Sequence, residues 1–227
     1  YFMIYDMNPA NLTLTAKFTG TILSVNSATQ FQASGTAGTT ISTATNGRCF
    51  YGTNRSGEIQ ALLTLAGTRG GFAQMPIGLM ACVSNLVVPG NVTLVGHGRD
   101  YPSTREFLQR GSALIRCGAF DGSNPFVQLG DTPNDYSSAK IKAEIRDIGI
   151  DAVERNDWVL GSVSSRSRTD NVTVWRGLGQ AAKFDSAGDP WIYHSVFGQQ
   201  NVGNVIVATG DMHLFDNHIR GSGNGGH

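Results

Sequence analysis

The sequence contains no long hydrophobic run and no excess of charge of either sign. Its longest apolar stretches, such as residues 62–66 and 86–88, fall far short of the roughly 20 residues that a membrane-crossing helix needs. We therefore expect no membrane span. Lysine plus arginine and aspartate plus glutamate number 17 each, so the chain has no basic field that would gather nucleic acid. A nucleic-acid partner is not expected either.

Cysteine is scarce, and several catalytic motifs are missing. The three cysteines, Cys49, Cys82 and Cys117, form no CxxC pair and have no metal-like spacing to histidines. We expect them to be small apolar residues packed in strands. The sequence has no GxxxxGK(S/T), HExxH or GxSxG pattern, which argues against nucleotide-binding and zinc-peptidase classes.

Glycine, in contrast, is abundant: 29 glycines against 7 prolines predict many turns and a β-rich protein. One short helix is expected near residue 60. Its apolar face has the spacing i, i+3, i+4, i+7 and consists of Ile59, Leu62, Leu63 and Ala66. Short β-favouring runs, each closed by glycine or proline, follow at residues 72–76, 78–83, 86–90 and 92–96. The helix is expected to cover one end of a coil of strands.

This segment, residues 57–98, resembles a known protein family. The helix is followed by the pair Gly70-Gly71, by Pro76-x-Gly78 and by the run LVVPGNVTLVGHG. The order is similar to the N-terminal cap of pectate-lyase-like right-handed parallel β-helix proteins. That superfamily includes polysaccharide lyases, glycoside hydrolases, uronan epimerases and bacteriophage tailspikes. The resemblance implies an all-β fold, a right-handed parallel β-helix with an N-terminal capping helix.

Residues 1–56 lie outside the resemblance and differ from it in composition and residue pattern. Residues 12–26 alternate apolar with hydroxyl side chains, as in a strand meander, and residues 34–47 are almost all Ser, Thr, Gly and Ala. Such strands bury little apolar area alone, so a partner surface is expected. We predict two regions. Residues 1–56 form a small β-rich attachment region or linker. Residues 57–227 form the cap and first rungs of a β-helix that continues beyond the chain end.

The later chain repeats at the spacing of a coil. Four pairs, each with members five positions apart, recur at intervals of 28, 19 and 22 along the chain: Ile145 with Ile150, Thr173 with Leu178, Ile192 with Phe197, and Leu214 with Ile219. If each pair points inward, stacked rungs bury a continuous apolar column, and each Leu or Ile contributes roughly 1.5 to 3 kcal/mol. The longer first interval is then explained by a loop at residues 161–170.

This register places one chemically capable side chain per rung on the outside of the coil: Asp147, Trp175, His194 and Asp216. Carboxylates offer acid and base groups, His194 can move a proton near neutral pH, and the Trp175 indole offers a flat face to a sugar. We interpret Asp147, His194 and Asp216 as candidate catalytic residues, and Trp175 as a candidate substrate-binding residue. The two aspartates should lie about 10 to 15 Å apart, beyond the roughly 5 to 9.5 Å of a glycosidase pair. The open alternative is a solvated outer surface.

The other carboxylates have simpler interpretations. Asp170, Asp189 and Asp211 each precede an expected strand, and we expect them to close corners by bonding their own backbone. The densest acidic group consists of Asp147, Asp151, Glu154 and Asp157. We expect it to be a solvated edge, with a calcium site as the alternative. No other cofactor is implied.

Two functions are left open. The first, which we favour, is a bacteriophage tail fibre or tailspike in the virion. It would be attached to other tail proteins through residues 1–56 and would bind, or also depolymerise, cell-surface polysaccharide. A homotrimer is expected in that case, because residues 1–56 bury little apolar area in a single chain and three parallel copies would share that burial. The second is a secreted bacterial polysaccharide lyase, glycoside hydrolase or uronan epimerase. The resemblance implies both, and fold alone does not choose between them.

Overall fold

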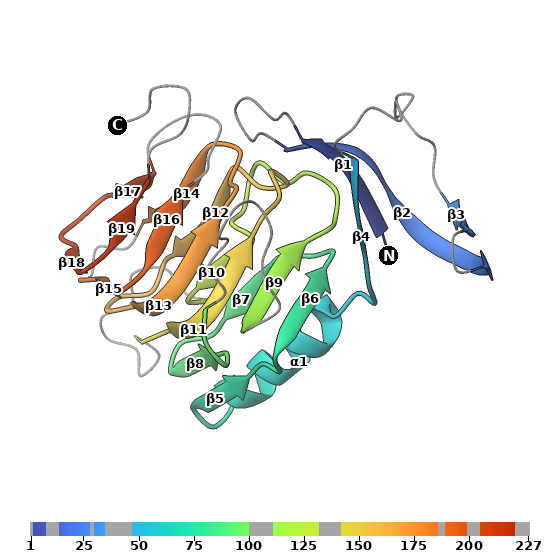
Figure 1. Ribbon diagram of the computed structural model, residues 1–227. Coiled ribbons are helices and arrows are strands. Elements are labelled where there is room, and N and C mark those ends of the chain that lie inside the picture. Colours follow the sequence, from blue (N-terminus) through green and yellow to red (C-terminus); the bar gives the residue numbers. More distant parts are fainter. Residues whose placement is uncertain are drawn as a thin grey trace.

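The protein consists mostly of β-strands in the computed structural model, which describes residues 2–7, 14–27, 30–34, 47–99, 111–131, 142–185, 189–198 and 205–220. Within these ranges there are nineteen strands, β1 to β19, and one helix, α1 (Ser56–Gly67). The strands form an antiparallel sheet near the N-terminus and stacked parallel sheets after it (Figure 1). Among the described residues, no helix has the length and apolar character that a bilayer crossing requires.

The N-terminal sheet is antiparallel and has the order β3-β2-β1-β4. Its strands are β1 (Phe2–Met7), β2 (Leu14–Ser27), β3 (Gln30–Ser34) and β4 (Gly47–Tyr51). Strand β2 is long enough to pair with β1 through its first half and with β3 through its second half. The described part of the alternating segment 12–26 lies in one strand, β2, so its β conformation was predicted correctly. Most of the Ser, Thr and Gly-rich segment 34–47 lies outside the described residues.

The remaining strands run parallel to their neighbours and form three ladders. The first ladder stacks β7 (Leu86–Val88), β10 (Val127–Leu129), β12 (Trp158–Ser162), β14 (Gln180–Phe184) and β17 (Ile206–Ala208). The second stacks β5 (Gly71–Gln74), β8 (Val92–Val95), the first halves of β11 (Glu144–Asp151) and β13 (Arg168–Trp175), β15 (Trp191–Tyr193) and β18 (His213–Phe215). The third stacks β6 (Gly78–Cys82), β9 (Ser112–Arg116), the second halves of β11 and β13, β16 (Val196–Gly198) and β19 (His218–Ile219).

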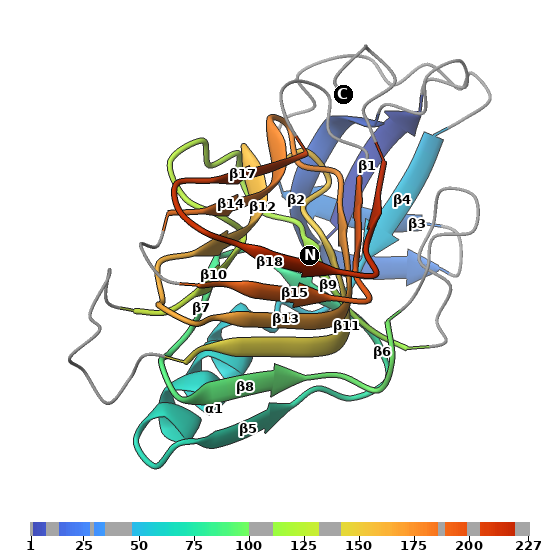
Figure 2. The same cartoon turned by 90° about the vertical axis from the view of Figure 1, so that its left-hand side faces the viewer.

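The chain visits the ladders in a fixed cyclic order. From β5 onward it passes through the second, the third and then the first ladder, and repeats this order along its length. Figure 2 shows the resulting stack, with α1 and β5 at one end and β17 and β18 at the other. This arrangement is compatible with the parallel β-helix that the sequence predicts.

Helix α1 covers one end of the stack, so the helix predicted near residue 60 is confirmed. Ile59 and Leu63 are buried in the core, whereas Leu62, predicted on the same face, is exposed. The Gln60 side chain bonds the backbone of Val87 twice: Nε2 donates to the carbonyl oxygen at 3.0 Å, and Oε1 accepts from the N–H at 2.8 Å. Gln60 thereby satisfies edge groups of β7 that another strand would otherwise bond.

The register predicted from the sequence is right for three of four rungs. Ile145 aligns with Thr169, Ile192 and Leu214, and Ile150 aligns with Val174, Phe197 and Ile219. The predicted pair Thr173 and Leu178 is therefore wrong by four positions. The repeat becomes nearly regular, with intervals of 24, 23 and 22 along the chain. Of the expected loop at 161–170, only residues 163–167 lie between strands, and the rest belongs to the end of β12 and the start of β13. Apolar spacing did not separate the two frames, because Thr169 and Thr173 both place a hydroxyl side chain at the first position of the pair.

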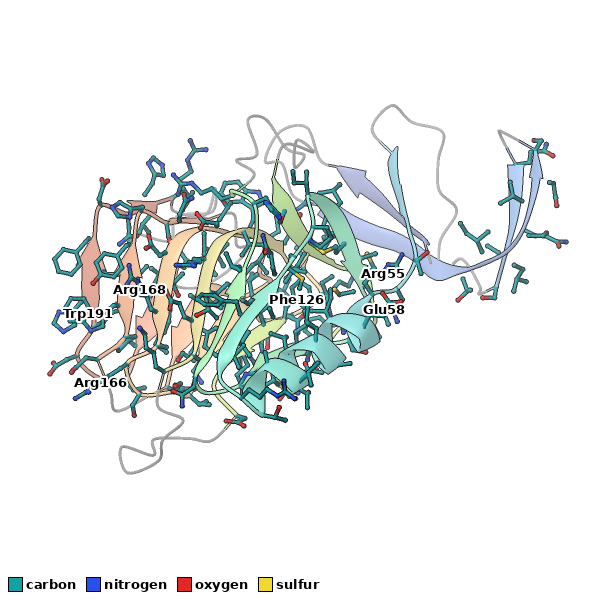
Figure 3. All side chains as sticks on the ribbon, turned by 90° about the horizontal axis from the view of Figure 1, so that it is seen from below. Arg55, Glu58, Phe126, Arg166, Arg168 and Trp191 are labelled. Atoms are coloured by element: carbon teal, nitrogen blue, oxygen red, sulfur yellow. The ribbon has the colours of Figure 1, made fainter. Side chains whose placement is uncertain are left out.

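The main core lies between the three ladders. Its fully buried members include Leu94, Leu129, Ile145, Val174 and Phe197, together with Phe126, which is labelled in the interior in Figure 3. A smaller cluster contains Ala113, Ile115, Cys117, Val153, Trp175 and Val196. These residues alternate with core residues along the third ladder, so they pack on its outer side.

Two of the cysteines are buried free thiols, as the sequence analysis expected. Cys82 belongs to the main core and Cys117 to the smaller cluster. Burial raises the pKa of the Cys82 thiol to about 12 and that of the Cys117 thiol to about 11. The side chain of Cys49 lies outside the described part of the structure.

Candidate functional site

Three of the predicted site residues lie in one column at a corner of the stack. The register aligns the residues that connect the second ladder to the third, namely Asp147, Asn171, His194 and Asp216. All four have a positive φ, from 46° to 55°, a conformation that Asn, Asp and His adopt several times more often than other non-glycine residues. We call these four residues the corner column. The positive φ at this bend is therefore sufficient to account for the Asp, Asn and His residues at these positions.

Trp175 does not belong to the corner column, and its predicted place on the outer stripe is wrong. It lies at the end of β13, is 4% exposed and packs with Val153 and Val196 outside the third ladder. The error follows from the misplaced second rung, where Asn171 occupies the position predicted for Trp175. A ring this buried presents no open face, so a sugar cannot stack on Trp175 in this structure.

The two carboxylates of the corner column are too far apart to act directly on one bond. Asp147 and Asp216 are three rungs apart, about 14 Å at the spacing of paired strands. A glycosidase pair needs roughly 5 to 9.5 Å. Asn171 Nδ2 donates to Asp147 Oδ1 at 2.7 Å. The Asp147 carboxylate therefore links neighbouring corners of the stack.

His194 has a carboxylate partner, Asp170, which the sequence analysis expected to close a corner. Nδ1 of His194 lies 3.0 Å from Oδ1 of Asp170, and Arg168 donates to Oδ2 at 2.9 Å. Burial raises the pKa of the Asp170 carboxyl, but the hydrogen bonds from His194 and Arg168 outweigh it and the net pKa is lowered. An ionised carboxylate only accepts hydrogen bonds, so Nδ1 of His194 is the donor in this contact. A histidine held by a carboxylate in this way is a candidate general base.

The outer face of the second ladder carries two columns of side chains. One column contains Phe72, Thr93, Glu144, Arg168, Trp191 and His213, and the other contains Gln74, Val95, Arg146, Asp170, Tyr193 and Phe215. Charged residues occupy the middle rungs, where Arg168 pairs with Asp170 at 2.9 Å and lies 3.6 Å from Glu144. Aromatic rings occupy the last two rungs. The face thus changes from ion-paired to aromatic along the stack, and Figure 3 shows Arg168 and Trp191 on the side away from Arg55 and Glu58.

Four aromatic side chains form what we call the ring cluster: Trp191, Tyr193, His213 and Phe215. The centroids of Trp191 and His213 are 4.1 Å apart with an interplanar angle of 17°, and those of Tyr193 and Phe215 are 5.3 Å apart at 14°. Residues two apart on a strand point to the same side, and paired strands hold their side chains at a fixed spacing. The ring cluster is not sealed from solvent, because Phe215 is 47% exposed.

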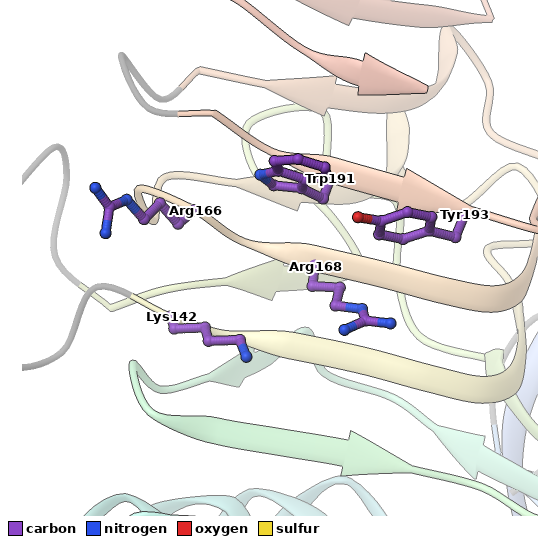
Figure 4. A pocket seen from close by; sticks show the side chains of 5 residues that line it. All are labelled: Lys142, Arg166, Arg168, Trp191 and Tyr193. Atoms are coloured by element: carbon purple, nitrogen blue, oxygen red, sulfur yellow. The ribbon is translucent and has the colours of Figure 1, made fainter. Parts of the chain in front are cut away.

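A pocket of about 310 Å³ opens where the aromatic and charged rungs meet. It is lined by Lys142, Arg166, Arg168, Trp191 and Tyr193 (Figure 4). His213 stacks on one face of Trp191, so the indole face that lines the pocket is the opposite one. The Arg168 guanidinium lies 4.9 Å from the centre of the Tyr193 ring. Among the described residues, the pocket therefore combines one open indole face with three cations.

The acidic group at residues 147–157 does not converge on a point. Asp151 is fully buried and forms an ion pair with Arg176, and Asp147 is bonded to Asn171. In the ranges that the structure describes, no three His, Cys, Asp or Glu side chains gather in a way that could hold a metal ion. The calcium alternative therefore gains no support from these residues.

The sequence analysis missed the ring cluster and the pocket. A signal was present, because Trp191-x-Tyr193 and His213-x-Phe215 are alternating aromatic pairs separated by one interval of the repeat. The pocket cations carry no comparable signal. Lys142 and Arg166 lie in two different connections, and they meet Trp191 only after the rungs have stacked.

Comparisons with protein-family models, with curated proteins and with solved structures find no match to this chain. What the structure establishes is a mostly β protein with stacked parallel sheets. The geometry of its outer face is therefore the ground for a functional assignment.

Proposed function

We propose that this protein is a bacteriophage tail fibre or tailspike-type protein that binds cell-surface polysaccharide on the outer face of the second ladder. The observation that carries the proposal is the ring cluster beside the pocket of Lys142, Arg166 and Arg168. Aromatic side chains bring large apolar contact area with a defined geometry. The rings occupy two successive rungs, and the open indole face of Trp191 at their edge suits a sugar ring.

The proposal includes a right-handed parallel β-helix of the pectate-lyase-like type. Two observations support it: the chain visits the three ladders in cyclic order, and α1 covers the edge of β7 through Gln60. The right-handed sense is expected because about 98% of connections between parallel strands of one sheet are right-handed.

Residues 1–56 are proposed to attach the protein to other tail proteins and to hold a homotrimer together in the virion. Strand β2 exposes Leu23 and Val25, whose exposed fractions are 64% and 71%. Replacing both with Asp in the full chain should reduce the mass measured by light scattering from three copies to one. Leu65→Asp is the matched control, because Leu65 is 61% exposed on α1 and should leave the trimer intact. A monomeric wild-type protein contradicts this part of the proposal.

Binding to oligosaccharides from bacterial capsules and lipopolysaccharides tests the function. Trp191→Ala removes the open indole face and should weaken binding by about 2- to 12-fold, since such ring contacts contribute roughly 0.5 to 1.5 kcal/mol. Trp158→Ala is the matched control: this indole stacks with Lys183 at 4.9 Å, but on the first ladder. Equal losses of affinity in both variants, or no binding of any oligosaccharide by the wild type, would contradict the proposal.

The Asp170 and His194 pair favours a second candidate, a secreted bacterial polysaccharide lyase, glycoside hydrolase or uronan epimerase. Nε2 of His194 would then act as the base. His194→Ala should lower the rate of depolymerisation by about 10²- to 10⁴-fold, whereas Asp147→Ala and Asp216→Ala should change it little. The loss of polysaccharide viscosity measures the rate. A wild-type protein that binds polysaccharide without lowering its viscosity or altering its uronate residues excludes this candidate.

A further inference from the structure

We infer that the pocket selects an anionic sugar residue, one that carries a carboxylate, sulfate or phosphate group. The inference rests on the proposed glycan-binding function and adds the chemical class of the ligand. It follows from which charges face solvent, from one cation that has no partner among the described residues, and from the wall that Trp191 forms.

The charged side chains that reach solvent at the pocket are cations. The side chains of Lys142 and Arg168 are 55% and 40% exposed, whereas those of Glu144 and Asp170 are 11% and 22% exposed. Both carboxylates therefore lie beneath the cations that they neutralise. No carboxylate of the described residues lines the pocket, so the surface that a ligand meets there is positive.

Arg166 adds a positive charge that no described residue compensates. It is exposed, lines the pocket beside Trp191 (Figure 4), and makes no hydrogen bond or ion pair with any described residue. A guanidinium group matches the paired oxygens of a carboxylate, sulfate or phosphate group. Hydrogen bonds between ionised groups are roughly twice as strong as neutral ones. Arg166 therefore contributes most when the ligand carries a negative charge.

The shape of the pocket suits one or two sugar rings. Its volume of about 310 Å³ is at the small end of the roughly 300–1,000 Å³ of small-molecule sites. A sugar ring can pack on the open face of Trp191, with Arg166 to one side and Lys142 and Arg168 on the neighbouring rungs (Figure 4). The indole then recognises the ring and the cations recognise its anionic substituent.

A glycan array tests the inference on the full chain. It would carry neutral bacterial oligosaccharides and acidic ones, each acidic member in its native form and in a matched carboxyl-reduced, desulfated or dephosphorylated form. We expect the native acidic members to bind at least tenfold more tightly than their neutralised counterparts. Arg166→Gln should remove most of that difference, because the variant loses affinity for the native members. Arg69→Gln is the control, because Arg69 is also exposed but follows α1 at the other end of the stack.

The outcomes separate this inference from the proposed function. Equal binding of native and neutralised members, or a preference for neutral glycans, overturns the anionic specificity and leaves glycan binding in place. Retained discrimination in the Arg166→Gln variant overturns the role of this pocket. If no member of the array binds, the proposed function falls and the inference falls with it. The chemical form of the bound members tells a carboxylate from a sulfate or phosphate ligand.

Discussion

The buried ion pair between Asp151 and Arg176 provides a direct test of the rung stacking. The two side chains are 0% and 5% exposed, and Nε of Arg176 donates to Oδ1 of Asp151 at 2.8 Å. The same oxygen accepts the Val153 N–H at 2.9 Å. The pair connects β11 to the residue that follows β13. Arg176→Met keeps the apolar part of the side chain and leaves the Asp151 carboxylate buried without its cation.

The expected loss of unfolding free energy in Arg176→Met is large because a lone buried charge has no solvent to stabilise it. Breaking such a pair from one side costs about 3 to 5 kcal/mol, a large share of the roughly 5 to 15 kcal/mol that stabilises a typical domain. For a chain of this size that corresponds to a drop in Tm of roughly 6 to 20 °C. The double variant Asp151→Asn/Arg176→Met buries no charge and should recover part of the loss.

Urea unfolding followed by circular dichroism measures these differences. Arg168→Met is the matched control, because Arg168 also pairs with an aspartate, Asp170, but is 40% exposed. Arg168→Met should lower the free energy of unfolding by no more than about 1 kcal/mol, as for exposed pairs. A loss below about 1 kcal/mol for Arg176→Met, or a double variant less stable than Arg176→Met alone, would refute the reasoning.

Two further predictions concern the cap and the thiols. Leu63→Ala, on the core-facing side of α1, should lower the free energy of unfolding by about 2 to 5 kcal/mol. Leu65→Ala, at an exposed site, should change it by less than about 0.5 kcal/mol. Similar values for the two variants would contradict the packing of α1 on the end of the stack. In a Cys49→Ser chain, Cys82 and Cys117 should resist a thiol reagent at pH 8 until urea unfolds the protein, because their pKa values are raised to about 12 and about 11. Unfolded thiols ionise near their ordinary pKa of 9.0, so the stability should fall as the pH rises from 9 toward 11. Rapid labelling of two thiols in the folded protein would contradict this burial.

The outcome for the candidate site shows where sequence patterns were informative. The pairs Ile145 with Ile150 and Ile192 with Phe197 identified inward positions correctly, because apolar periodicity reports burial. The pattern failed at the second rung, since Thr169 and Thr173 carry the same hydroxyl side chain and neither gives an apolar signal. That single slip exchanged Asn171 for Trp175 and moved a buried indole to the predicted surface.

By itself, the sequence determined the β-rich class, the helix near residue 60 and the placement of Asp147, His194 and Asp216 at equivalent positions of successive rungs. These features follow from local periodicity and from residue types that tolerate the bend. Only the tertiary structure decided which side chains surround the pocket. Arg166 and Trp191 come from different rungs and meet because burial of the whole apolar column fixes the register between rungs, and no single rung encodes that register.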